Sequence, residues 1–190
     1  AKLFQLLACP FDAMGATMAT YCGQNVGACK LDRLGRGIRS CTALGLGWSL
    51  LVLCAMLAFA PQCAMLFLDP SEEQLALLVE LTARYTVIQV SFYFPLALVN
   101  IVRFSIQGMG FSTFAILAGV LEMFARTGVA TLLVPIFGYT AACLASPAAW
   151  LAADLFLLPA SIFCISRLRK LYPSVPDKSD CLVDITVDAF

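Results

Sequence analysis

Runs of apolar residues, each long enough to cross a lipid bilayer, alternate along the chain with short polar segments. A helix that crosses the hydrocarbon core needs about 20 mainly apolar residues. Residues 41–68, 85–107, 112–137 and 143–166 meet this requirement, and residues 3–22 form a less apolar fifth run. Strands of a transmembrane barrel would instead alternate over about ten residues. The pattern therefore predicts an all-α fold, a polytopic transmembrane helical bundle of about five membrane helices.

The composition agrees with a membrane protein and argues against several other classes. Of the 190 residues, 61% are hydrophobic and 13% are charged, whereas a soluble domain has about 25% charged residues. The net charge is zero and histidine is absent, so nothing favours a nucleic-acid partner or a histidine metal site. The nine cysteines are scattered without a C-x-x-C pair, which favours small apolar residues over metal ligands. No nucleophile–base pattern is visible, so we predict neither an enzyme nor a cofactor.

Basic residues gather in particular connections between the apolar runs. Lys30, Arg33, Arg36 and Arg39 lie between the first two runs. Lys and Arg are retained on the cytoplasmic side of a membrane, so alternation from this segment assigns each later connection to one side. Residues 29–40, 108–112 and 166–170 are predicted to be cytoplasmic, and residues 69–74 and 138–147 to lie outside. We therefore expect a multi-pass protein of the plasma (inner) membrane with its basic loops inside.

The same pattern predicts two regions. Residues 1–170 form the transmembrane bundle, and residues 171–190, which contain prolines and acids but no apolar span, form a flexible cytoplasmic tail. Ser71, Glu73 and Gln74 resemble a helix-capping sequence and predict an amphipathic start to the next helix. The first residue is not Met and opens an apolar run, which suggests that the chain is part of a longer protein.

Ionisable residues inside the apolar runs are the first candidates for function, because each costs about 2.5–3.5 kcal/mol to insert into hydrocarbon. Asp12, Glu122 and Asp154 lie well inside their runs, and we consider them candidates for cation or proton coupling. Glu122 and Arg126 are four residues apart and can neutralise each other on one helix face, so an internal ion pair is the alternative. Asp12 and Asp154 have no basic neighbour at helical spacing. One interpretation is that such a carboxyl exchanges a proton or a cation during transport. The alternative is that it has only a structural role, either staying protonated or bonding to another helix.

Residues 85–107 contain amide and aromatic side chains but no carboxylate. Gln89, Tyr93, Asn100 and Gln107 are candidates to line a path for flat organic cations, which bind to aromatic faces. The alternative is that these side chains only pack in the bundle or face lipid. Pro95 lacks an N–H and is predicted to bend the helix.

The sequence GQNVGA at residues 23–28 lacks the Gly-Lys-Ser/Thr ending of a phosphate loop and follows no predicted strand. Gly23 and Gly27 are predicted to let the chain turn and pack closely. Gln24 and Asn25 are predicted to bond carbonyl groups near a helix end. Direct contact with a substrate is the alternative.

Four segments, in order, resemble transporters of the MATE (multidrug and toxic compound extrusion) family. Residues 10–38, PFDAMGATMATYCGQNVGACKLDRLGRGI, are similar to the segment that joins the eighth and ninth helices of that family. RFSIQGMG (103–110), GVLEMFAR (119–126) and PAAW (147–150) resemble parts of the tenth, eleventh and twelfth helices. The resemblance implies most of a C-terminal six-helix half, whose partner is the missing N-terminal half. Many members place an Asp in the tenth helix for cation binding, and this chain has none there.

The resemblance implies a secondary active antiporter that exports amphipathic or cationic drugs or toxic organic compounds across the plasma membrane. The exchanged ion would be Na⁺ or H⁺, and the partners would be the lipid bilayer and a small organic substrate. One alternative is a lipid-linked oligosaccharide flippase of the same wider superfamily, which would be expected to show a more cationic cavity than Arg103 and Arg126 provide. A second alternative is a non-transporting membrane fragment.

Overall fold

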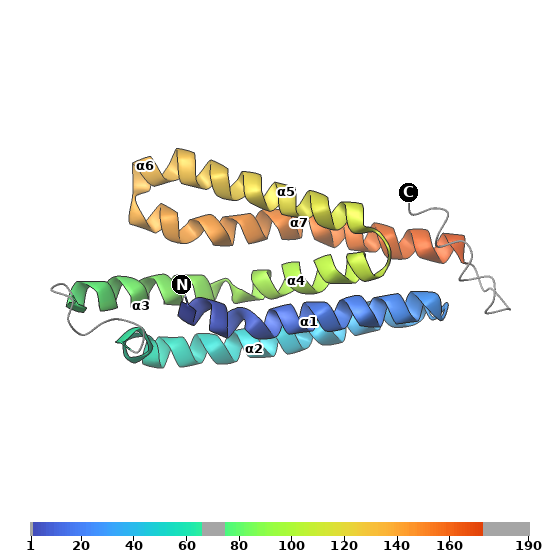
Figure 1. Ribbon diagram of the computed structural model, residues 1–190, viewed down its shortest axis with the longest axis horizontal. Coiled ribbons are helices and arrows are strands. Elements are labelled where there is room, and N and C mark those ends of the chain that lie inside the picture. The colour runs from blue at the N-terminus through green and yellow to red at the C-terminus, as the bar shows by residue number, and fades with distance from the viewer. Residues whose placement is uncertain (1, 66–74, 173–190) are drawn as a thin grey trace.

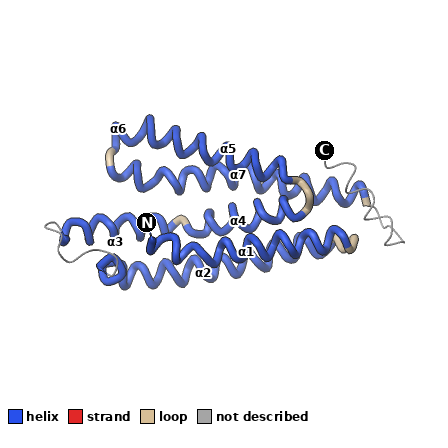
Figure 2. Tube along the Cα trace, in the orientation of Figure 1, coloured by secondary structure: helices blue, strands red, loops and turns tan. Residues whose placement is uncertain are grey.

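The computed structural model describes residues 2–65 and 75–172, which fold into a bundle of long helices that run roughly alongside one another (Figures 1 and 2). The elements in chain order are α1 (Lys2–Gly27), α2 (Asp32–Met65), α3 (Leu75–Ser91), α4 (Tyr93–Gly108), α5 (Ser112–Gly128), the π-helical segment η1 (Val129–Leu133), α6 (Val134–Phe137) and α7 (Tyr139–Leu171). These residues contain no strand, so the predicted all-α fold is confirmed. The predicted capping residues 71–74, and the predicted tail beyond Tyr172, lie outside the described residues.

Several of these helices are long and apolar enough to cross a membrane. Asp32–Ala60, Ser112–Phe137 and Tyr139–Leu171 each qualify as a single span, and the bent pair Ala76–Ser91 and Tyr93–Gly108 qualifies as a fourth. The helix α1 has 26 residues and is therefore long enough to cross a membrane, but it is not among the helices that are also apolar enough. This agrees with the prediction of a less apolar first run.

Helix α4 is the centre of the bundle, because it packs against α1, α2, α5 and α7. Its buried side chains include Tyr93, Ile101 and Ile106, none of which is exposed to solvent. The Tyr93 ring makes edge-to-face contacts with Phe4 and Phe11 of α1, at centroid distances of 5.5 and 5.3 Å. An aromatic cluster therefore anchors the start of α4 to α1.

The long run at residues 85–107 is not one straight helix. It belongs to α3 and α4, which meet at Phe92 with a bend of 50°. Pro95 is the third residue of α4 and has no N–H to donate to the carbonyl of Ser91, so the regular hydrogen bonding of the helix stops there. The predicted proline bend is confirmed, and it lies one turn before the proline.

The connection between α6 and α7 differs from the prediction. Residues 138–147 were expected to form an outside loop, but α7 begins at Tyr139 and Gly138 alone makes the turn with a φ of +57°. Glycine adopts this left-handed conformation without steric cost. Pro147 lies inside α7, so the proline did not mark a helix start. The predicted span at residues 112–137 is confirmed, and it contains the irregular η1 segment just before Pro135.

The basic segment at residues 29–40 also differs from the prediction, because most of it is helical. Helix α2 begins at Asp32, and an acidic residue in a first turn is favourable next to the positive end of the helix dipole. Arg33, Arg36 and Arg39 are therefore exposed on the first turns of α2 rather than in a loop. The connection itself is only a few residues long.

Three regions that were predicted to share one side of the membrane do lie at one end of the bundle. Figure 1 shows the α1–α2 turn, the α4–α5 turn and the end of α7 together on the right. Arg169 of α7 is 3.7 Å from the Asp32 carboxylate, and the Arg167 guanidinium lies 5.9 Å from the centre of the Phe111 ring. The exposed cations of α2 and α7 are therefore neighbours.

Helices α1 and α4 approach each other closely because small residues line their contact. Gly15, Ala19 and Gly23 lie four residues apart on α1 and therefore share a face. A Cβ atom on Gly15 would meet the Phe104 ring, and a Cβ atom on Gly108 would meet the backbone of Ala19. Spacing of this kind lets two membrane helices pack backbone to backbone.

Candidate functional site

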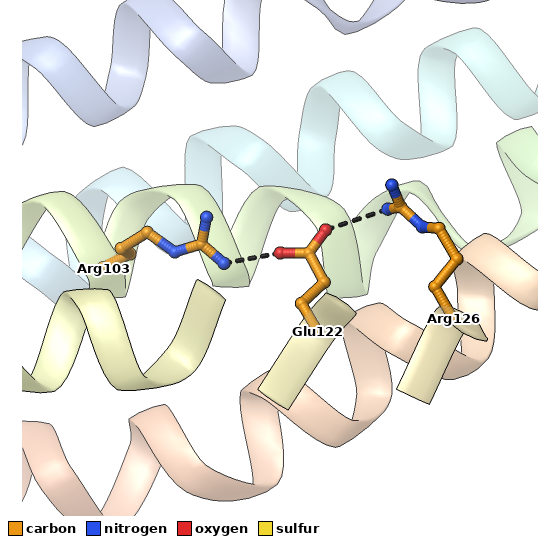
Figure 3. A network of polar contacts seen from close by, with 3 residues as sticks. All are labelled: Arg103, Glu122 and Arg126. Carbon is orange, nitrogen blue, oxygen red and sulfur yellow. Dashed lines mark hydrogen bonds and ion pairs between the residues drawn. The ribbon is translucent and has the colours of Figure 1, made fainter. Parts of the chain in front are cut away.

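Three charged side chains of α4 and α5 form a chain of ion pairs. The Glu122 carboxylate of α5 accepts a hydrogen bond from Arg103 Nη2 of α4 at 2.6 Å and another from Arg126 Nη2 at 2.9 Å. Figure 3 shows Glu122 between the two guanidinium groups. The predicted pair of Glu122 and Arg126 is confirmed. Each carboxylate oxygen has its own cation, so Glu122 joins α4 to α5.

Arg103 is the partner that the sequence analysis missed. Helical spacing indicates pairs only within one helix, whereas Arg103 and Glu122 come from two antiparallel helices joined by the short turn at residues 109–111. Arg103 lies five residues before the end of α4 and Glu122 lies ten residues after the start of α5, which is close enough for two long side chains to meet. The sequence therefore contained a clue to this pair, because two opposite charges flank a predicted helical hairpin within reach of each other.

Asp154 lies on the buried side of α7 and is 7% exposed. Its Oδ1 atom is fully buried and has no hydrogen-bond partner among the described residues. Helix α7 packs against α4, which carries Arg103. The structure therefore brings Asp154 towards the Arg103–Glu122–Arg126 group.

Asp12, in contrast, is exposed on α1. Among the described residues it has no hydrogen bond or ion pair to another side chain. The exposed neighbours of Asp12 on this helix are small or polar, and include Ala16, Thr17 and Thr20. The hydroxyls of Thr17 and Thr20 donate to carbonyls of their own helix, at 2.8 and 3.2 Å. The three candidate carboxyls thus have three different environments: ion-paired, buried, and exposed.

The predicted lining residues do not converge on one surface. Gln89 is 1% exposed, and its amide donates to the carbonyl of Cys143 at 3.1 Å. Tyr93 is fully buried, and its hydroxyl donates to the carbonyl of Phe4 at 3.0 Å. Asn100 is partly buried and Gln107 is exposed. The substrate contacts of these four residues stay a prediction.

The GQNVGA segment forms the end of α1. Gly23 packs against α4, since a Cβ atom there would lie 3.3 Å from the carbonyl oxygen of Gly108. Gly27 ends the helix, but nothing lies within 4 Å of a Cβ atom placed there, so its predicted close packing is wrong. Asn25 is buried and donates to the carbonyl of Tyr21 at 2.8 Å. Gln24 is exposed.

A cavity of about 580 Å³ lies where the α3–α4 bend, η1, α6 and the first half of α7 meet. Its volume falls in the range of about 300–1,000 Å³ that is typical of small-molecule sites. Its lining is almost wholly apolar, with Thr140 as the one residue that carries a polar side chain. The lining residues are Phe92, Val129, Leu133, Phe137, Thr140, Ala141, Leu144, Pro147, Ala148 and Leu151. No local sequence pattern marks this cavity, because its walls come from three separate segments.

A comparison with protein families gives a match that agrees with the apolar helices. Comparisons with curated proteins and with solved structures give no match. The MatE family model matches residues 1–132, a region that extends from α1 into η1 and includes Asp12, Arg103, Glu122 and Arg126. Since this match covers more than half of the 190 residues, the chain belongs to the MatE family of membrane transporters.

Proposed function

We propose that this chain forms one lobe of a secondary active antiporter that exports amphipathic or cationic organic compounds across the plasma membrane in exchange for Na⁺ or H⁺. Membership of the MatE family supports transport, and the long apolar helices support a place in the membrane. The observation that carries the proposal is the exposed face of α1, where the residues from Cys9 to Gln24 are small or polar and the Asp12 carboxyl has no partner among the described residues.

The exposed face of α1 is poorly suited to lipid. Between Cys9 and Gln24 its exposed side chains are small or polar. They are Cys9, Asp12, Ala13, Ala16, Thr17, Thr20, Gly23 and Gln24. A charged side chain in hydrocarbon costs about 2.5–3.5 kcal/mol, and such residues therefore face a water-filled cavity or another part of the protein. We infer that this face lines the transport pathway between two lobes.

Asp12 is the best candidate for ion coupling among the three predicted carboxyls. Two arginines already neutralise Glu122, so Glu122 has little need for a further cation. Asp12 has no such partner among the described residues, and its exposure lets it exchange Na⁺ or H⁺ as access alternates between the two sides of the membrane. Asp154 is buried away from this face.

The orientation of the lobe follows from its charges. The exposed cations at the start of α2 and the end of α7 lie at one end of the bundle. Positive residues are retained in the cytoplasm, so we propose that this end is cytoplasmic. The other end, with the α6–α7 turn, then faces outside.

The flippase alternative has less support. A carrier of a pyrophosphate-linked lipid needs free cations in its cavity, and the guanidinium groups of both Arg103 and Arg126 are engaged by Glu122. The non-transporting alternative makes a different prediction, since loss of Asp12 would then have no effect on any transport assay.

Efflux of a fluorescent organic cation from a drug-sensitive host that expresses the complete gene tests the proposal. We expect efflux to collapse when both the sodium and the proton gradients are removed. Asp12→Asn should abolish efflux at normal membrane expression. Asp32→Asn is the matched control, because Asp32 is an exposed carboxylate at the end of the bundle, and it should leave efflux unchanged. Normal efflux by Asp12→Asn would overturn the coupling role.

A further inference from the structure

Two of the three buried polar side-chain atoms that have no hydrogen-bond partner among the described residues lie on the neighbouring helices α4 and α7. One is Nε of Arg103 on α4, and the other is Oδ1 of Asp154 on α7. Helices α4 and α7 pack directly against each other, so opposite charges on their buried faces attract each other. An N–H donor and a carboxylate acceptor are thus both buried and both unused, which is costly in a membrane protein.

The other side of the Arg103 guanidinium is already engaged, since Nη2 bonds Glu122 at 2.6 Å. Glu122 does not depend on this bond alone, because its second oxygen bonds Arg126 at 2.9 Å. If Arg103 left, Glu122 would still have a cation on its own helix. Within the described part of the chain Asp154 has no such second cation, so there Arg103 is the charge that the two carboxyls share.

The charges of this group balance in only one protonation state. Arg103 and Arg126 contribute two positive charges, and Glu122 contributes one negative charge. The sum is zero when Asp154 is a carboxylate and +1 when Asp154 carries a proton. Other elements packed against α7 add little, because Glu80 and Arg84 of α3 are exposed and η1 and α6 have no ionisable residue.

We propose that Arg103 exchanges between Glu122 on α5 and Asp154 on α7, and that a proton on Asp154 sets this exchange. When Asp154 is a carboxylate, it accepts the Arg103 Nε–H and draws the guanidinium towards α7. When Asp154 takes up a proton, its side chain becomes a neutral carboxyl group that no longer attracts the guanidinium, and Arg103 returns to Glu122. The proton comes from hydronium in water, whose O–H bond breaks as the Asp154 O–H bond forms, and Arg103 stays charged throughout.

The exchange links the packing of α4 with α5 to the packing of α4 with α7. When the Arg103 side chain changes its partner, it therefore weakens the contact of α4 with one neighbouring helix and strengthens the contact of α4 with the other. That the exchange accompanies alternating access depends on the proposed antiport function. The exchange itself does not depend on it, and it is measured without any transport.

The test is the ¹⁵Nε–H signal of Arg103 in the protein reconstituted in lipid nanodiscs, with arginine labelled selectively and the signal assigned by its loss in Arg103→Lys. The buried Nε–H exchanges slowly with water, so its signal persists where those of exposed arginines fade. We expect a component that is lost in Asp154→Asn and on acidification. The same component should grow in Glu122→Gln, because this change removes the competing carboxylate.

Two further variants keep the test decisive if Glu122→Gln fails to fold. Arg126→Gln leaves Glu122 with Arg103 alone, so the Asp154-bound component should shrink. Asp32→Asn removes a carboxyl that is exposed on α2 at the end of the bundle, and it should leave the signal unchanged. An Arg103 signal that does not respond to Asp154→Asn would overturn the proposal, even in a protein that exports the dye normally.

Discussion

Helices α1 and α2 are adjacent in the sequence and pack together, yet their exposed faces are chemically opposite. From Cys9 to Gln24 the exposed face of α1 has no large apolar residue. Between residues 41 and 60 the exposed face of α2 has no polar side chain other than a thiol, and includes Leu44, Leu51 and Leu57. Exposed residues of this bundle therefore belong to two chemically different surfaces, a small and polar one on α1 and a large apolar one on α2.

The difference shows how residue chemistry identifies the medium that a helix faces. Leu44 is 66% exposed and Leu57 is 65% exposed, which would be unfavourable in water but is favourable against lipid chains. Asp12, Thr17 and Thr20 would be unfavourable against lipid and favourable against water. We therefore infer that α2 faces the bilayer, and that α1 faces the pathway or the second lobe.

The largest expected effect comes from placing a charge on each face. Leu51 is 59% exposed on α2, and Leu51→Asp should weaken membrane insertion by about 2.5–3.5 kcal/mol. Ala16→Asp introduces the same carboxyl on the exposed face of α1 and should insert normally. The folded fraction in the membrane after expression measures both. Equal loss in the two variants would remove the distinction between the faces.

The next effect concerns how α1 is held in place. Gly108→Ala adds a Cβ atom that meets the backbone of Ala19, so α1 must move away from α4, at a cost of about 1–3 kcal/mol. Gly47→Ala is the control on α2, because nothing lies within 4 Å of a Cβ atom there. Unfolding in lipid by steric trapping gives the two free energies. A stable Gly108→Ala variant would mean that α1 is not fixed by this contact.

The smallest effect is on transport rate. Ala16→Leu adds apolar bulk to the exposed face of α1 and should lower efflux several-fold without lowering expression. Ala58→Leu adds the same bulk to the exposed face of α2 and should have no effect, because lipid accommodates it. Dye efflux per unit of membrane protein compares them. A stronger effect from Ala58→Leu would reverse the assignment of the faces.

The apolar pattern predicted the class of fold and most of the helices, but it misplaced several helix ends. Hydropathy reports where a helix is in lipid, not where its hydrogen bonding stops. Helix α2 begins nine residues before the apolar run at Cys41 because Asp32 and the arginines after it are compatible with a helix in water. The start of α7 was missed for a related reason, since Gly138 alone was enough for the turn.

The candidate site was only partly predictable from the sequence. In the sequence, Asp12 and Asp154 are both lone carboxyls in apolar runs. In the structure, Asp12 is exposed, whereas Asp154 is buried. Which face of a helix is buried depends on its neighbours, and those contacts join residues far apart in the chain. The Glu122–Arg126 pair was predictable because it depends only on helical spacing. Arg103 joins that pair from another helix.

The chain has natural probes for the central claim, because an exposed free cysteine lies on each face: Cys9 on α1 and Cys54 on α2. A charged, water-soluble thiol reagent reacts with thiolate in water and does not enter hydrocarbon. Applied to the complete transporter in membranes, it should modify Cys9 much faster than Cys54, whereas a lipid-soluble maleimide should reach both. Cys9→Ser and Cys54→Ser assign the modified peptides. Modification of Cys54 but not Cys9 by the charged reagent would contradict a water-accessible pathway along α1.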